Sequence, residues 1–122
     1  MEFDADRYEA RLAGSQNFAR TCRQLKLLEL CQSSALEDLD QFRRESRLPD
    51  NLPALIVSKI PQIPSDEFRE LEHELLEVKT GWADSHPSDR DRIENAAREQ
   101  AAGIFQLEHP SGLLFTDVKG LC

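Results

Sequence analysis

Two carboxylates near the start of the chain, Glu2 and Asp6, are spaced so that they could act together. They stand at positions i and i+4 of a segment, 1–13, that we expect to form a helix ending at Gly14, so both side chains leave the same helix face. Carboxylate oxygens on one face can bind a cation. Acidic residues in a first helical turn also simply complement the helix dipole. The residues themselves leave both interpretations open.

The histidines are the second group with possible chemistry. His86 precedes Pro87 at the expected start of a helix, where an imidazole can donate a hydrogen bond to a developing oxyanion or merely close a loop. His73 falls on the polar side of an expected helix, which predicts a surface position. His109 also precedes a proline, and we interpret it as structural.

Both groups lie in segments that resemble one protein family. Glu2-Phe-Asp-Ala-Asp6, followed by Arg7-Tyr8 and Leu12-Ala-Gly14, resembles the Glu-x-x-Ala-Asp helix of the M48 family of zinc metallopeptidases. About 80 residues later, Ser85-His86-Pro87 and Arg92-Ile93 are similar to the family's Ser/Thr-His-Pro segment and the Arg-Ile pair five residues after its proline. The two matches occur in the family's order.

The resemblance implies a role for each of four residues. Glu2 would be the third zinc ligand, and Asp6 would accept a hydrogen bond from a ligand imidazole and fix its tautomer. His86 would lie near the active site as a catalytic residue that stabilises the oxyanion, and Arg92 would anchor its segment. The implied cofactor is Zn²⁺, which activates a water for attack on a peptide bond.

The family's His-Glu-x-x-His motif, with two zinc ligands and the catalytic Glu, does not occur in this sequence. We therefore expect residues 1–122 to be a single helical region, the C-terminal part of a zincin-type peptidase domain, inactive and without bound zinc by itself. The resemblance implies a parent that cleaves peptide or protein substrates, is anchored to a membrane through absent segments, and has a cytoplasmic-side domain. The missing N-terminal catalytic half would be this chain's partner.

Composition excludes several other classes of function. The net charge of −8 disfavours binding to nucleic acid and to anionic membrane surfaces. Apolar runs such as 54–57 are far shorter than a membrane span. Three cysteines without metal spacing indicate a reducing compartment and no disulfide framework, and Cys22 is expected to be a buried thiol.

Apolar periodicity and the absence of strand patterns predict an all-α fold of about five or six helices. After 1–13, we expect one long helix over 15–48 ended by Pro49, a short buried helix within 50–60, and an extended linker at 60–64. Helices over 66–79, from Ser88 onward and within 110–121 complete the fold. Ser15, Ser65 and Ser88 are predicted N-caps, and Gly81 and Gly103 lie where C-caps would.

The expected core positions follow the same periodicity. Beneath the first helix these are Ala5, Leu12 and Ala13. On the later helices they are Phe18, Cys22, Leu25, Leu28, Ala35, Leu39, Phe42, Phe68, Leu71, Leu75, Val78, Ile93, Ala96, Ala97, Leu114, Phe115 and Val118.

A different class of function remains possible from the sequence. The long acidic helix and the apolar helix faces are typical of a helical protein-interaction module without catalytic activity. A His-Glu-x-x-His motif encoded upstream of Glu2 would favour the peptidase, and an unrelated domain there would favour the interaction module.

Overall fold

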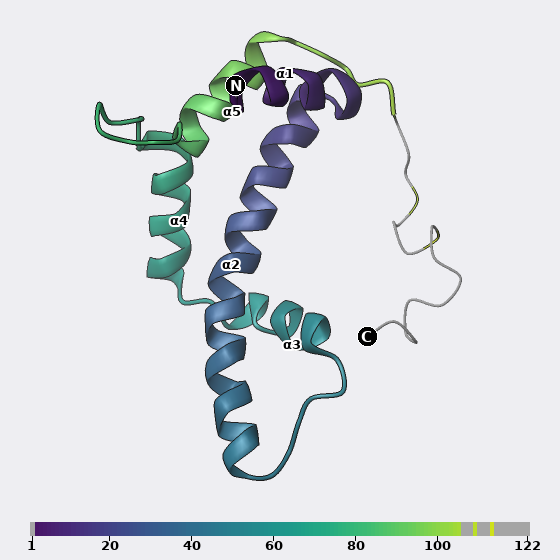
Figure 1. Cartoon of the computed structure of the whole chain (residues 1–122), viewed down its shortest axis with the longest axis vertical. Coiled ribbons are helices and arrows are strands. Elements are labelled where there is room, and N and C mark those ends of the chain that lie inside the picture. Colours follow the sequence, from purple (N-terminus) through teal and green to yellow (C-terminus); the bar gives the residue numbers. More distant parts are fainter. Residues whose placement is uncertain (1, 106–108, 110–112, 114–122) are drawn as a thin grey trace. The chain divides into compact units, whose positions relative to one another are not determined.

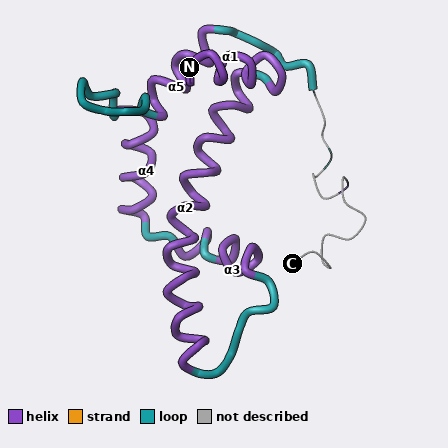
Figure 2. Tube along the Cα trace, in the orientation of Figure 1, coloured by secondary structure: helices purple, strands orange, loops and turns teal. Residues whose placement is uncertain are grey.

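The computed structural model describes residues 2–105, 109 and 113, and these residues confirm the all-α prediction. Within them there is no strand (Figure 2). No described helix is both long and apolar enough to cross a membrane. The helix expected within 110–121 lies outside the described residues. The described helices are α1 Glu2–Ala13, α2 Ser15–Arg44, α3 Leu52–Ser58, α4 Ser65–Glu77 and α5 Asp89–Arg98, with a 3₁₀ turn, η1, at Ile60–Gln62.

The described helices fall into two compact units, with the division inside α2 at Leu28. The first unit contains α1, the part of α2 up to Leu27, α4 and α5. The second contains the rest of α2, α3 and η1. Figure 1 shows α2 as one uninterrupted helix, so the prediction of a single long helix is confirmed.

The core of the first unit is small and is built mainly from α1, α2 and α5. Ala10, Phe18, Cys22 and Ala96 are buried, and Ile93 packs against them. The small alanines allow α1 and α5 to approach each other closely. Cys22 is buried, as predicted, and burial raises the pKa of its thiol.

Several predicted core positions are exposed instead. Leu25 on α2 is 61% exposed, although Phe18 and Cys22 on the same predicted stripe are buried. The apolar side chains of one helix face spread over a wide angle, and a neighbouring helix covers only those that point directly at it. Ala5, Leu12, Phe68, Val78 and Ala97 are also exposed, so the faces that pack are narrower than their apolar patterns.

The second unit buries Cys31 and Ala35 of α2. The prediction that the short helix after Pro49 is buried was wrong, because α3 has no buried residue. The extended linker predicted at 60–64 was also wrong in part, since Ile60–Gln62 forms η1. Lys59 between the two is buried and forms an ion pair with Asp38 of α2, which compensates its charge.

The ends of the helices show which local signals acted as expected. Ser88 caps α5 by accepting a hydrogen bond from the Asp91 N–H, as predicted. Ser65 makes no side-chain cap, and Gly81 does not cap α4, which ends at an extended Val78. The helix predicted to reach residue 48 stops at Arg44, because Ser46 adopts a left-handed φ of 55°.

Two glycines allow the turn between α1 and α2 to cross the segment that follows α5. Gly14 has a φ of 98°, and a Cβ there would lie 2.8 Å from the Ala102 carbonyl oxygen. Gly103 has a φ of 86°, and a Cβ there would lie 2.7 Å from the backbone of Ala13. The crossing is closed by the Ser15 N–H, which donates to the Ala101 carbonyl at 2.9 Å. It attaches α1 to the end of α5.

Candidate functional site

The four residues singled out by the sequence come from two segments that the fold brings together. Glu2 and Asp6 lie on α1, His86 lies on the loop between α4 and α5, and Arg92 lies on the first turns of α5. α1 and α5 pack side by side (Figure 1). The packing pairs both Glu2 and Asp6 with a cationic or potentially cationic side chain about 85 positions away in sequence.

Asp6 and Arg92 form the buried pair. The Arg92 Nε donates to Asp6 Oδ2 at 3.0 Å, and Nη2 donates to Oδ1 at 2.7 Å, a bidentate geometry. Asp6 is only 2% exposed. The guanidinium also lies over the Phe18 ring, 5.8 Å from its centroid. Hydrogen bonding to Asp6 raises the pKa of Arg92 above its ordinary value, so this residue stays charged.

Glu2 and His86 form the outer pair, one helical turn from the first. The His86 Nδ1 contacts Glu2 Oε1, and the two side chains are 76% and 41% exposed, respectively. When Nδ1 carries the proton it donates to Oε1. Glu2 Oε2 and His86 Nε2 are then the atoms through which each side chain can meet a further partner.

A hydrogen-bonded cluster fixes the base of the loop that carries His86. The Thr80 hydroxyl donates to Asp91 Oδ2 and accepts from the Ser88 N–H at 2.8 Å. The Thr80 N–H also donates to Asp91 Oδ2, at 3.0 Å. These bonds from Thr80 lower the pKa of Asp91. The cluster joins the end of α4 to the N-terminus of α5, so both ends of loop 80–88 are held.

A second ionic cluster secures the other end of α1. Glu99 accepts from Arg7 Nε at 2.7 Å and from Arg11 Nε at 2.8 Å. These hydrogen bonds lower the pKa of Glu99. Arg7 pairs with Glu99 and Asp4 and not with Asp6, which is buried.

Sequence reasoning missed Glu99, Thr80 and Asp91. For Asp91 a signal exists, because Ser88-x-x-Asp91 has the spacing of a capping box. Thr80 and Glu99 carry no local signal, since their partners are defined by tertiary packing. The predicted surface position of His73 is confirmed, and His109 is also exposed.

The described residues contain no group of three or more His, Cys, Asp or Glu side chains placed to bind a metal ion. Glu2 and His86 together provide one carboxylate and one adjacent imidazole. A complete tetrahedral zinc site needs further protein donors.

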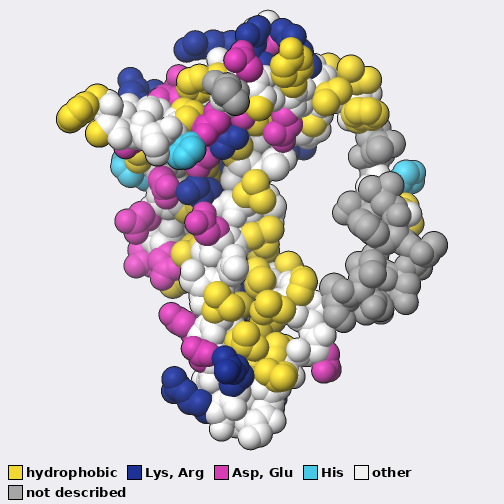
Figure 3. Space-filling view, viewed as in Figure 1, with side chains coloured by type: hydrophobic (Ala, Val, Ile, Leu, Met, Phe, Trp, Pro, Cys, Tyr) yellow, Lys and Arg dark blue, Asp and Glu magenta, His cyan; other side chains and the backbone are white. Residues whose placement is uncertain are grey.

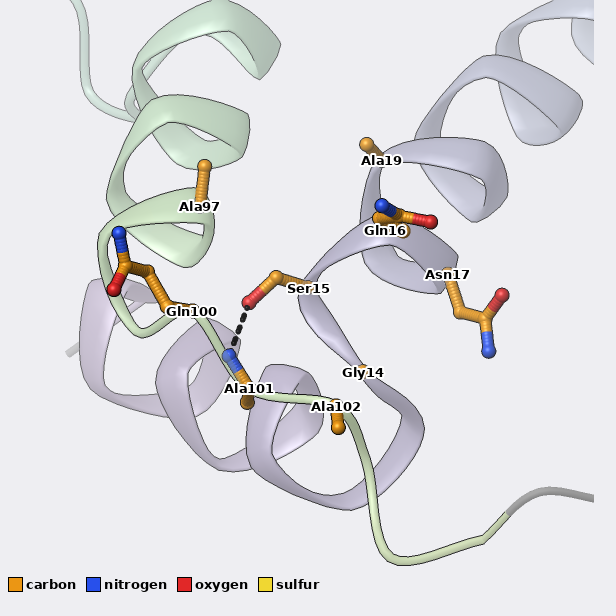
Figure 4. A pocket seen from close by; sticks show the side chains of 9 residues that line it. All are labelled: Gly14, Ser15, Gln16, Asn17, Ala19, Ala97, Gln100, Ala101 and Ala102. Atoms are coloured by element: carbon orange, nitrogen blue, oxygen red, sulfur yellow. Dashed lines mark hydrogen bonds between the residues drawn. The ribbon is translucent and has the colours of Figure 1, made fainter.

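A separate pocket of about 590 Å³ lies where the two glycine-containing segments cross (Figure 4). It is lined by the start of α2 and by the end of α5 with the residues that follow it. The Ser15 hydroxyl accepts from the Ala101 N–H at 3.2 Å and donates to the Ala96 carbonyl at 2.7 Å. The predicted N-cap role of Ser15 was therefore wrong: its side chain ties α5 to the crossing. None of the four candidate residues lines this pocket.

Comparison with known proteins finds no matching family, no matching curated protein and no matching solved structure.

Proposed function

We propose that this chain supplies the C-terminal, helical part of an M48-like zinc metalloendopeptidase, whose His-Glu-x-x-His helix is contributed by sequence outside the chain. One observation carries the proposal. The two motif-like segments, which are far apart in sequence, meet residue by residue: Glu2 pairs with His86, and Asp6 pairs with Arg92. Two contacts in register between these segments support the proposal.

In this proposal Glu2 is a metal ligand and His86 acts next to it. With His86 donating to Oε1, Glu2 keeps Oε2 to face a cation. When bound, Zn²⁺ would lower the pKa of a water molecule for attack on the peptide bond. The exposed imidazole of His86 would exchange its hydrogen bond to Glu2 for one from the same Nδ1–H to the negative charge that develops on a substrate carbonyl.

Asp6 and Arg92 have a positioning role in the same proposal. Both carboxylate oxygens of Asp6 accept hydrogen bonds from Arg92. Arg92 therefore takes the place of the ligand imidazole that the resemblance implied as the partner of Asp6. The buried pair holds α5, and with it the loop that bears His86, against the helix that bears Glu2.

The test begins with the coding sequence upstream of Glu2. We expect a His-Glu-x-x-His motif there, and we expect the longer protein to carry about one zinc per chain and to cleave an unfolded protein such as casein. A zinc chelator should abolish cleavage, and replacing the Glu of that motif with Gln should abolish cleavage while zinc is retained. An unrelated upstream domain, or cleavage that is indifferent to zinc, contradicts the proposal.

An exposed apolar surface favours the second candidate function, a helical interaction module. The N–H groups of Ile104 and Phe105 donate to the Leu12 carbonyl at 2.8 and 3.1 Å, so these three residues are neighbours at the end of α1. With Tyr8 they form a surface whose members are between 47% and 73% exposed. If the upstream sequence lacks the metal motif, this surface is where a protein partner of the module would bind.

A further inference from the structure

The loop between α4 and α5 carries the chain's one tryptophan, Trp82. No other part of the described chain covers its side chain. Trp82 is 101% exposed, the highest value among the described apolar side chains. The loop projects from the junction of α4 and α5 in Figure 1, and Figure 3 shows hydrophobic side chains at its outer end. An indole exposes more apolar area than almost any other side chain, so full exposure has a solvation cost that a binding partner relieves.

Hydrogen bonds hold the backbone of the loop that presents this side chain. Its base is held by the Thr80, Ser88 and Asp91 cluster. Its tip is a turn in which the Asp84 N–H donates to the Gly81 carbonyl at 3.2 Å, while the Gly81 N–H donates to Asp84 Oδ2 at 2.6 Å. Much of the entropy lost when a loop binds a partner has therefore already been lost on folding.

Trp82 also lies within reach of the candidate site. It is four positions from His86 in the sequence, so the two Cα atoms are at most roughly 14 Å apart, and the turn shortens this span. An extended peptide rises about 3.3 Å per residue. A polypeptide lying across the Glu2 and His86 pair therefore reaches Trp82 within about four residues of the bond nearest His86.

We propose that Trp82 is a specificity-determining residue that binds a bulky apolar side chain of the polypeptide substrate, within four residues of the cleaved bond. This inference rests on the proposed peptidase function. The acidic balance of the chain disfavours an anionic membrane surface as the partner of this loop. The hydrogen bond from Gly81 to Asp84 engages the loop's own carboxylate, which leaves the indole as its recognition group.

The deciding experiment uses the full-length protein and pairs of fluorogenic peptides that differ only by Phe or Gly at one position within four residues of the cleaved bond. For the preferred position, we expect Trp82→Ala to raise KM for the Phe peptide about 10-fold, with kcat and the Gly peptide little changed. Trp82→Phe should keep most of the preference. Leu25→Ala, which removes another exposed apolar side chain, should behave as wild type.

The outcomes separate the two proposals. A full-length protein that cleaves neither peptide contradicts the peptidase function, and the role of Trp82 falls with it. A protein that cleaves both, with the preference for Phe unchanged in Trp82→Ala, contradicts only the role of Trp82.

The single tryptophan also makes the isolated chain its own fluorescent reporter. We expect its emission to stay at the position of a solvated indole when the protein is concentrated and when neutral phosphatidylcholine vesicles are added. A blue shift on concentration would assign the loop to self-association, and a blue shift with vesicles would assign it to a lipid surface. Either result overturns the proposal.

Discussion

At the scale of single residues, the buried pair between Asp6 and Arg92 is the contact on which the candidate site most depends. Removing one partner of such a pair leaves the other partner buried without a compensating charge, which destabilises the folded state. The outer pair is different, because an exposed ion pair contributes little to stability. The inner pair therefore holds the site together, and the outer pair is available for chemistry.

We expect Arg92→Ala to lower the free energy of unfolding by roughly 3 kcal/mol, at the low end for a broken buried pair because Arg92 is itself about a third exposed. Urea unfolding monitored by circular dichroism measures this loss in the free energy of unfolding. The exposed Arg98→Ala on the same helix should stay within about 0.5 kcal/mol of wild type. Equal losses in the two variants would show that the pair does not hold α1 to α5.

Glu99 predicts a pH dependence of stability. Its pKa in the folded chain is lowered from an ordinary 4.5 by hydrogen bonds from Arg7 and Arg11, so folding favours the ionised form. Its stabilising contribution is therefore complete above the unfolded pKa and is lost as pH falls through the lower folded pKa.

The variant Glu99→Gln isolates this contribution. We expect it to unfold at lower urea than wild type at about pH 7, and we expect the difference to shrink as the pH falls below 4.5 and on through the lower folded pKa, because the wild-type carboxylate then becomes protonated. Other acid effects act on both proteins and cancel in the difference. A gap that stays constant over this range would contradict the role given to Glu99.

At the scale of elements, loop 80–88 and helix α5 behave as one piece because the helix cap and the loop base share Ser88. Its hydroxyl accepts from the Asp91 N–H at 3.2 Å, and its own N–H donates to Thr80. A change at the cap should therefore be felt by the loop that carries His86.

Two serines with the same sequence signal provide a matched test of this cap. Ser88→Ala should lower the free energy of unfolding by about 1 kcal/mol, because α5 loses its side-chain cap. Ser65→Ala should change it by only a few tenths, because the structure shows no side-chain cap at the start of α4. Thermal or urea unfolding of the two variants decides it, and a larger loss at Ser65 would reverse our assignment of the caps.

At the scale of the whole molecule, the described residues contain no group of three or more side chains placed to bind a metal ion. We expect isothermal titration calorimetry of the 122-residue chain to show no stoichiometric zinc site tighter than micromolar. A tighter site would mean that the chain contains its own set of ligands, and the proposed division of the metal site between this chain and upstream sequence would be wrong.

In the longer zinc peptidase that we propose, the loss of Glu2 and the loss of His86 should have different effects. Glu2→Ala should be purified with little zinc and regain some activity in excess zinc, because a ligand is missing. His86→Ala should keep its zinc and its KM while kcat falls roughly 10- to 1,000-fold, because the hydrogen bond to the oxyanion strengthens only in the transition state. Full zinc in Glu2→Ala together with normal turnover in His86→Ala would contradict both roles.

Local rules were sufficient for much of the fold. Helical periodicity predicted the positions of α1, α2, α4 and α5, and the caps at Gly14 and Ser88 were correctly identified. These signals act between residues three or four positions apart, so the sequence contains them in full. The four candidate residues were likewise chosen from short motifs.

Only the tertiary structure decided which of those residues meet. The contacts between Asp6 and Arg92 and between Glu2 and His86 depend on the packing of α1 against α5, which no periodicity specifies. Because of the same packing, the Ser15 side chain bonds to the backbone of Ala96 and Ala101 and does not cap α2. The packing also left Leu25 and Trp82 in solvent, because whether an apolar side chain is buried depends on the neighbour it finds, and that neighbour lies far away in sequence.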